Sequence, residues 1–420
     1  FIPPINDGFA MTYQRKNVVS STFWTLCVMG FFAILSSTMS KSPVLKPFSL
    51  SLGTPADWTG VVASASTIPG ILVSLPAASL SDIFGRKKFL LIAGFVFASA
   101  PFLYLLITVW WQLILVRFYH GFATAIFVPV AEASIAELFP TKRGERISLF
   151  HSATYVGRVI APTLGGYILF ATADNFHTLY LSVAVAGVVA LVVSLSFLRG
   201  GEQLLTKGQF GAGETVKRLF HGWRIILHNR GVLLVSFVQA SLYYAYGTAE
   251  FFLAGYLPEV AGLDKFSTGI ILTSIIVVAI FARPYMGRIS DKIGRRIPIV
   301  LGCMVSAVPL FAVLFTANFY VLLLLAMVYG FGLATVTAST PALISELTPK
   351  ELVGTSMGFL DTIMDVGQTV GPIISGLILA TNLQYTGVFF SISILLLITS
   401  ATFASIKLKQ NRNKVNGNKT

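Results

Sequence analysis

The sequence contains few charged residues. Only 11% of its 420 residues are Asp, Glu, Lys or Arg, whereas 55% are hydrophobic, and the mean hydropathy is +0.78. A soluble protein of this length carries about a quarter charged residues. The composition therefore excludes an ordinary soluble domain and predicts a polytopic integral membrane protein.

Cysteine and the common catalytic motifs are also scarce. The two cysteines, Cys27 and Cys303, both lie in apolar stretches, so no disulfide framework is predicted. The chain has no Gly-x-x-x-x-Gly-Lys-Ser/Thr and no His-Glu-x-x-His pattern. The hydrolase-like pattern that begins at Gly354 follows a loop rather than a strand. We therefore predict no enzyme, no metal site and no cofactor.

What the chain has instead is a series of long apolar segments. A membrane-spanning helix needs about 20 mostly apolar residues. The sequence predicts twelve such helices, and hence an all-α integral membrane fold. They cover residues 18–39, 58–80, 89–108, 111–137, 147–171, 177–198, 232–256, 268–287, 297–316, 319–346, 354–380 and 385–406.

Basic residues outnumber acidic ones, 30 against 17, which gives a net charge of +13. If both chain ends are cytoplasmic, nearly all Lys and Arg fall on the cytoplasmic side, as the positive-inside rule requires. The outer segments then hold only Lys41, Lys46 and Lys265. This asymmetry accounts for the positive charge without a nucleic-acid partner. The short termini and loops favour the inner (plasma) membrane of a prokaryote.

The predicted spans form two groups of six, residues 18–198 and 232–406, joined by the cytoplasmic segment 199–231. Apolar residues recur at helical spacing from Val216 to Leu227 of this segment, with basic residues between them. This pattern predicts a basic amphipathic helix on the membrane surface, and a plain tether is the alternative.

The two chain ends are predicted to be cytoplasmic. Residues 407–420 form a basic tail, and residues 1–17 precede the first span. Residues 1–10 come before Met11 and are expected to be non-native or upstream sequence.

One short turn occurs twice. Ser81-Asp82-Ile83-Phe84-Gly85-Arg86-Lys87 and Ser290-Asp291-Lys292-Ile293-Gly294-Arg295-Arg296 each lie between two apolar segments. Gly85 and Gly294 permit a backbone conformation that a side chain opposes. Asp82 and Asp291 are 209 positions apart, close to half the chain. The turn therefore indicates an internal duplication.

The duplication extends well beyond this turn. Three further pairs share its offset, and three more share an offset that is one residue longer. The pairs are Gly121 with Gly330, Glu137 with Glu346, Pro140 with Pro349, Gly157 with Gly367, Pro162 with Pro372 and Gly166 with Gly376. Parallel repeats of this kind place a binding site between the halves, near the middle of the bilayer.

These motifs resemble the major facilitator superfamily over residues 18–406. Asp82-x-x-Gly85-Arg86-Lys87 and the fuller Gly287-x-x-x-Asp291-x-x-Gly294-Arg295-Arg296 are similar to its signature between the second and third spans, although the first copy has Ala78 where Gly is usual. The resemblance implies two pseudo-symmetric six-helix bundles that rock about a central cavity. It also implies that these turns hold the inner gate shut, and Glu137 and Glu346 are interpreted as their ion-pair partners.

Charged residues inside predicted spans are candidate functional residues, because burying a charge in a bilayer costs several kcal/mol. Arg117, in Arg117-Phe118-Tyr119-His120-Gly121, resembles the family's fourth-span Arg, which faces the central cavity and is linked to proton transfer. Glu132 lies about four turns further along the same helix. We predict Glu132 as the proton carrier, paired with Arg117 or Arg158, with a structural interfacial Glu as the alternative.

Arg158 lies within the stretch from Gly157 to Gly166 that resembles the fifth-span motif of proton-coupled antiporters, particularly drug exporters. Ala161 replaces the usual Gly before Pro162. Small residues permit close helix packing and proline favours a bend, so Gly157, Pro162 and Gly166 are predicted to serve gating. Arg158 either binds an anionic substrate group or pairs with Glu132.

The second half has its own intramembrane charges. Asp361 and Asp365 are one turn apart, so they share a helix face. With Arg283 they are expected to form a buried network or a second proton site. Glu250 is predicted either to contact substrate or to lie at the outer mouth. The aromatic residues predicted to line the cavity include Trp24, Tyr119, Tyr243, Tyr246 and Tyr329.

The predicted function is proton-coupled export of a small amphiphilic organic molecule by a monomeric secondary transporter. Its expected partners are that molecule, protons and lipids. The main alternative is proton symport that imports an organic anion, held by Arg117 and Arg158, or a sugar-like solute. An alternative of another class is a non-transporting receptor or lipid scramblase.

Overall fold

The computed structural model describes residues 7–200, 224, 226–349 and 352–406, and the regular structure of these residues is entirely helical. The helices of the first half are α1 (Asp7–Met39), α2 (Leu45–Ser51), α3 (Ala56–Ser64), α4 (Ile68–Phe84), α5 (Arg86–Tyr104), α6 (Trp110–Leu138), α7 (Arg143–Ala171) and α8 (Phe176–Gly200). Those of the second half are α10 (Arg230–Glu259), α11 (Lys265–Ile293), α12 (Arg296–Ala312), α13 (Phe319–Leu347), α14 (Val353–Leu379) and α15 (Gln384–Ser405).

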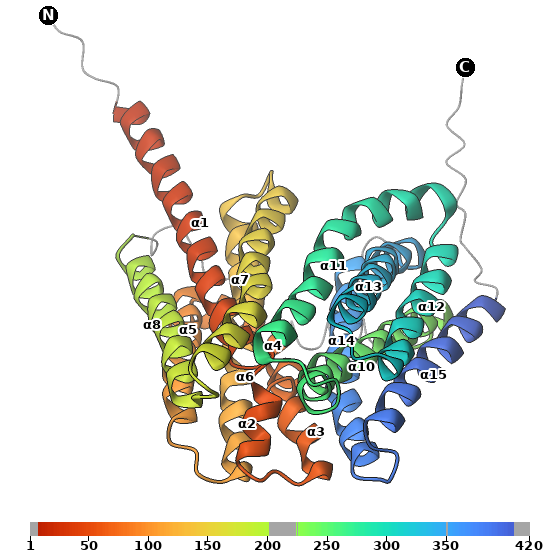
Figure 1. Cartoon of the computed structure of the whole chain (residues 1–420). Helices are drawn as coiled ribbons and strands as arrows, with labels where there is room; N and C mark the ends of the chain where they lie inside the picture. The colour runs from red at the N-terminus through yellow and green to blue at the C-terminus, as the bar shows by residue number, and fades with distance from the viewer. Residues whose placement is uncertain (1–6, 201–223, 225, 350–351, 407–420) are drawn as a thin grey trace, which may run out of the picture.

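The helices form two bundles that stand side by side and diverge toward the end where the chain termini lie (Figure 1). In the first bundle α1 packs on α7 and α8, and α5 packs on α6 and α8. In the second, α13 packs on α11 and α12, and α10 packs on α14. The predicted all-α membrane fold of two six-helix bundles is confirmed.

Ten helices of the described residues are long and apolar enough to cross a membrane. The two remaining predicted spans are α7 and the pair α3 and α4. Helix α7 is long enough, but His151, Ser152, Thr154 and Arg158 make its middle more polar. The pair α3 and α4 is instead interrupted.

The second predicted span, residues 58–80, is not one continuous helix. Helix α3 ends at Ser64 and α4 begins at Ile68. Pro69 has no N–H to donate to the preceding turn, so an unbroken helix would lose a hydrogen bond here. The Thr67 hydroxyl instead donates to the Ser64 carbonyl at 2.9 Å. The prediction of a continuous span was wrong at this position.

Two pseudo-symmetric seams join the bundles away from the termini. Helix α14 packs on α3 and α4, and α7 packs on α11 (Figure 1). Ser64 Oγ donates to the Thr369 carbonyl at 2.6 Å. At the other seam Thr273 Oγ1 donates to the Val159 carbonyl at 3.1 Å. The two donors, Ser64 and Thr273, occupy equivalent positions in the two halves, and so do the two acceptors. The duplication therefore extends to the interface between the bundles.

Glycines allow the same seams to close. A Cβ at Gly60 would overlap the carbonyl oxygen of Pro372, and a Cβ at Gly269 would overlap that of Pro162. These two contacts are again equivalent under the sequence repeat. Each seam therefore combines a glycine, a proline carbonyl and a hydroxyl donor.

At the opposite end, the repeated turns bond within their own bundles. Gly85 and Gly294 adopt φ of 99° and 88°, as the turn requires. Arg86 Nε lies 3.1 Å from Glu137 Oε2 in the first bundle. Arg295 pairs with Asp291 and donates to Glu346 Oε1 at 2.8 Å in the second bundle. The predicted gating role of these pairs remains a prediction.

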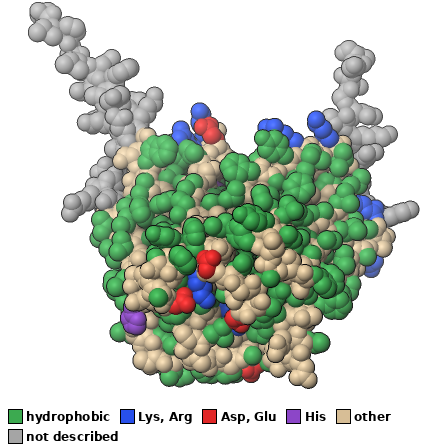
Figure 2. Space-filling view, viewed as in Figure 1, with side chains coloured by type: hydrophobic (Ala, Val, Ile, Leu, Met, Phe, Trp, Pro, Cys, Tyr) green, Lys and Arg blue, Asp and Glu red, His purple; other side chains and the backbone are tan. Residues whose placement is uncertain are grey.

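The bundles diverge at the end with the basic turns, and Lys and Arg side chains gather at the surface there (Figures 1 and 2). The structure therefore shows a state that is closed at the α2 and α3 end and open at the end with the basic turns.

Some predictions fall outside the described residues. They include the N-terminal residues 1–6, most of the amphipathic segment from Val216 to Leu227, and the tail 407–420. The side chain of Asp82 is also outside the described part, although its backbone belongs to α4. The predicted domain boundaries remain predictions.

Candidate functional site

Polar side chains from both bundles face each other about midway along their helices. Arg158 of α7 and Asp361 of α14 are both exposed, although each lies far from its helix ends. Arg158 is within electrostatic range of Tyr243 and Tyr246 of α10, which belongs to the other bundle. These side chains therefore line the space between the bundles, which we call the central cavity.

One part of the cavity is acidic. Glu132 Oε1 of α6 lies 3.1 Å from His151 Nε2 of α7. Asp361, from the opposite bundle, interacts electrostatically with both groups. The predicted pairing of Glu132 with Arg117 or Arg158 was wrong, since the side chain beside its carboxylate is His151. Glu132 and Asp361 repel each other unless a proton or a cation lies between them.

Asp365 lies one turn from Asp361, against the broken second span. Its Oδ2 atom would be 3.0 Å from a Cβ placed on Gly70, near the start of α4. Asp365 makes no hydrogen bond or ion pair with the described residues. The predicted charge network with Arg283 was therefore wrong, because Arg283 bonds elsewhere.

A second part of the cavity is basic. Arg283 of α11 donates to the Tyr155 hydroxyl of α7 at 3.2 Å and to the Thr337 hydroxyl of α13 at 3.2 Å. The Arg158 guanidinium lies 5.8 Å from the centre of the Tyr155 ring. Tyr155 thus stands between two arginines that come from opposite bundles.

Two tyrosines of α10 border this basic part. Tyr243 is within electrostatic range of both Arg158 and Arg283, and Tyr246 is within range of Arg158. The two tyrosine rings contact each other edge to face, with centroids 5.8 Å apart. Both were predicted cavity residues, and the structure places them beside Arg158.

Glu250 lies where the bundles meet at the closed end. Lys41, just beyond α1, donates to Glu250 Oε2 at 2.6 Å, and both side chains are largely buried. Both predicted roles of Glu250, contact with substrate and a carboxylate at the outer mouth, remain predictions.

A second lysine–glutamate contact lies nearby. Lys46 of α2 is 1% exposed and lies 5.8 and 5.7 Å from the ring centres of Phe251 and Phe252. It interacts electrostatically with Glu259, which also accepts a hydrogen bond from Tyr385 at 3.0 Å. Two lysines of the first bundle thus face two glutamates of the second.

Arg117 does not face the cavity. It is 2% exposed and donates to Ser66 Oγ at 2.5 Å, at the break between α3 and α4. It is also within electrostatic range of Tyr104, whose hydroxyl lies 3.4 Å from His120 Nδ1. The expectation of a cavity-facing Arg117 was wrong, because this side chain points into the interior of the first bundle.

The other predicted aromatic residues have different surroundings. Tyr119 is hydrogen-bonded to Ser99 of α5 at 2.8 Å, so its hydroxyl points into its own bundle. Trp24 is 53% exposed and contacts Phe23 edge to face. The predicted substrate-binding role of Trp24 remains a prediction.

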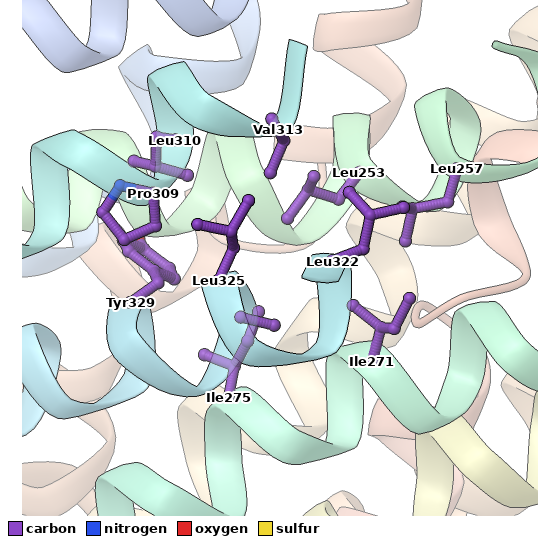
Figure 3. Close-up of a pocket in the computed structure, with 11 residues that line it drawn as sticks. Leu253, Leu257, Ile271, Ile275, Pro309, Leu310, Val313, Leu322, Leu325 and Tyr329 are labelled. Carbon is purple, nitrogen blue, oxygen red and sulfur yellow. The ribbon is translucent and has the colours of Figure 1, made fainter. Parts of the chain in front are cut away.

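Tyr329 lines an apolar pocket inside the second bundle, between α10, α11, α12 and α13 (Figure 3). The side chain is 2% exposed, and its hydroxyl has no hydrogen-bond partner among the described residues. A small adjoining pocket connects Tyr329 with Tyr246 and Glu250. Tyr329 therefore lies behind the cavity wall.

The predicted gating residues of α7 lie at two different contacts. A Cβ at Gly157 would meet the Phe31 carbonyl of α1, within the first bundle. A Cβ at Gly166 would meet the Lys265 carbonyl of α11, across the seam, and the Pro162 carbonyl faces Gly269 there. Gly157 thus sets packing within a bundle, whereas Pro162 and Gly166 contact the other bundle.

Four residues of the site were missed by sequence reasoning: Lys41, Ser66, Tyr155 and His151 as a partner of Glu132. For three of them the sequence carries no distinctive pattern. Lys41 did carry a signal, since it and Glu250 are 209 positions apart, which is the repeat offset, and have opposite charge. Within the described part of the chain, no cluster of His, Cys, Asp and Glu is arranged to hold a metal ion.

Comparison with known proteins identifies a family. Residues 25–281 and 235–419 match the family model of the Major Facilitator Superfamily. The multi-drug resistance efflux pump PmrA homolog of Lactococcus lactis is 24% identical over 385 residues, covering 88% of this chain and 91% of that protein. The multidrug resistance protein MdtG of Dickeya zeae is 25% identical over 367 residues, covering 85% and 86%.

Solved structures show the same fold. A bacterial homolog of the human lysosomal transporter Spinster, in an inward-facing and unoccupied conformation, superposes with a TM-score of 0.78 at 14% identity, covering 92% of this chain and 96% of that one. A mutant of the nucleoside transporter NupG gives a TM-score of 0.75 at 13% identity, covering 91% and 99%.

Proposed function

Because this chain belongs to the Major Facilitator Superfamily and is a multi-pass membrane transporter, we propose that it exports a small amphiphilic organic molecule in exchange for protons. The proposed location is a prokaryotic inner membrane, with both termini in the cytoplasm. The cavity then opens to the cytoplasm in this structure. The relatives named as multidrug efflux pumps support the direction of transport.

The observation that carries the proposal is the acidic cluster of Glu132, His151 and Asp361. Its members come from both bundles, so the distance between the charges depends on how far apart the bundles stand. Like charges held close in a site of low dielectric favour uptake of a proton. Proton binding therefore changes the energy of bringing the two bundles together, which is what coupling to alternating access requires.

Alternating access also requires a barrier that opens when the substrate is released, and the closed end of the structure provides it. The Lys41–Glu250 pair and the two glycine seams close the α2 and α3 end in this structure, which is the outer end in the proposed orientation. Export requires these contacts to separate while the cytoplasmic ends approach each other. The repeated turns with Arg86 and Arg295 are proposed to hold the cytoplasmic ends together in that second state.

Import of an organic anion by proton symport is a second candidate, and one observation favours it. Arg158 and Arg283 both face the cavity, although the clamp predicted from Arg117 and Arg158 does not form. Symport and antiport share the acidic cluster and differ in the direction of the coupled fluxes.

Transport by purified protein in liposomes separates these functions. The liposomes contain a pH-sensitive dye, and ethidium, 1-naphthaleneacetate or a neutral naphthyl alcohol is added outside. Proton movement opposite to that of a probe supports the exporter. Proton movement in the same direction as a probe supports the symporter instead of the exporter. Probe flux that ignores a proton gradient would contradict proton coupling, and the absence of flux with retained binding would show a receptor.

A further inference from the structure

We propose that the transported molecule carries an anionic group, of the carboxylate, sulfonate or phosphonate class, and that Arg158 and Arg283 bind this group between the two bundles. The inference rests on the proposed transport function, since it assigns a ligand to the same cavity. The evidence for it is the hydrogen bonding of the two arginines and the aromatic side chains around them.

Neither arginine has a carboxylate partner among the described residues, whose ion pairs include neither Arg158 nor Arg283. The hydrogen-bond acceptors of Arg283 are the hydroxyls of Tyr155 and Thr337, and its buried Nε has no acceptor within the described part of the chain. Arg158 lies near the ring of Tyr155 and is exposed to the cavity. Two guanidinium groups are thus left with unused donors.

The nearby carboxylates are engaged elsewhere. Glu250 is within electrostatic range of Arg158, but Lys41 holds it at 2.6 Å. Asp361 interacts with Glu132 and His151. Charge compensation for the arginine pair is therefore incomplete in the described part of the protein, and an anionic ligand group would complete it.

The positions of Arg158 and Arg283 suit an anionic group whose oxygen atoms can accept hydrogen bonds from both guanidinium groups. A guanidinium presents its N–H groups in a planar fork that matches carboxylate and phosphate oxygens, and such charge-assisted bonds are stronger than neutral ones. Tyr155 already contacts both arginines, so one group beside its hydroxyl would meet Arg158 from α7 and Arg283 from α11. Because these helices belong to different bundles, the ligand would bridge them.

The remainder of the ligand would be apolar or aromatic. Tyr243 and Tyr246 border the arginines and form an edge-to-face pair. Binding pockets for organic ligands are mostly apolar, with a few polar groups that fix orientation. An aromatic or polycyclic anion therefore fits this part of the cavity better than a small hydrophilic anion.

Equilibrium binding to purified protein in detergent, without any proton gradient, tests the inference. The probes are 1-naphthaleneacetate, 1-naphthylmethylammonium and 1-naphthylmethanol, which share one aromatic body, and binding is measured by calorimetry. We expect the acetate to bind at least tenfold more tightly than the cation. Arg158→Gln and Arg283→Gln should each remove this preference, and Arg158→Lys should retain part of it.

Arg288→Gln is the matched control, because Arg288 is an exposed arginine on the same helix as Arg283. It should leave the preference unchanged. Equal or tighter binding of the cation, or a preference that survives both Gln variants, would overturn the inference. Anion binding without proton-coupled flux would instead contradict only the proposed transport function.

Discussion

Lys41 and Glu250 occupy equivalent positions in the two halves of the chain, and they bind each other. They are 209 positions apart, as are Asp82 and Asp291 of the repeated turn. The Nζ and Oε2 atoms lie 2.6 Å apart, with side-chain exposures of 14% and 12%. The axis that relates the two bundles therefore passes close to this ion pair. This ion pair joins the two bundles at the closed end, where α2 and α3 lie.

Breaking this pair should favour the state that is open to the outside. Lys41→Gln or Glu250→Gln removes one partner of a largely buried ion pair. A cost of about 1–2 kcal/mol would shift the ratio of the two states by roughly five- to thirtyfold. The measurement is the distance between spin labels on Leu106→Cys and Leu383→Cys, which are exposed outer-loop positions, in a background without Cys27 and Cys303.

The charge exchange Lys41→Glu with Glu250→Lys should restore the short distance, because it restores the pair. Asp174→Asn serves as the control, since Asp174 is exposed and Asn tolerates its φ of 61°. Unchanged distances in the single variants would show that the pair does not hold the outer end closed.

Substitutions in the glycine seams should shift the two states at least as strongly as substitutions in the Lys41–Glu250 pair. Gly60→Ala and Gly269→Ala each place a methyl group onto a proline carbonyl of the opposite bundle. Because the backbone atoms cannot move aside without parting the seam, both variants should populate the outward-open state and lengthen the same spin-label distance. Gly144→Ala and Gly354→Ala, where a Cβ meets open space, are the controls. A seam variant with the wild-type distance would contradict this account of closure.

Arg117 should contribute to stability rather than to binding. Arg117→Ala removes a buried side chain and leaves the half-buried hydroxyl of Ser66 without its donor, which is expected to cost about 2 kcal/mol. The apparent melting temperature in detergent should therefore fall, whereas Arg158→Ala, at an exposed position, should leave it nearly unchanged. If Arg117→Ala has the melting temperature of the wild type and loses only proton coupling, this account is contradicted. Arg117 would then have the role in proton transfer that its motif predicts.

The sequence was sufficient to predict most of the membrane spans, because length and hydropathy are local properties of a segment. The repeat offsets likewise predicted which residues would be equivalent, and Ser64 and Thr273 show that this equivalence reaches single hydrogen bonds. The break at residues 65–67 was missed because the surrounding segment is apolar. Pro69 was the available signal.

The pairings within the cavity were less predictable. Glu132, Arg158 and Asp361 were identified because charges are rare inside spans. Their partners depend on helix rotation and on the contact between bundles, which no local pattern encodes. Glu132 was therefore assigned to an arginine, whereas the fold places His151 beside it. Arg117 was assigned to the cavity, although its helix turns it toward Ser66.

The most direct test of the account is substrate-driven proton movement in liposomes, measured for the wild type and for Glu132→Gln. The wild type should move protons opposite to its substrate. Glu132→Gln should lose this movement while it still exchanges substrate across the membrane at equal pH, because the cavity and its arginines are intact. Glu145→Gln, at an exposed position on the same side, should behave like the wild type. Proton movement at the wild-type rate in Glu132→Gln would contradict the central role of the Glu132, His151 and Asp361 cluster.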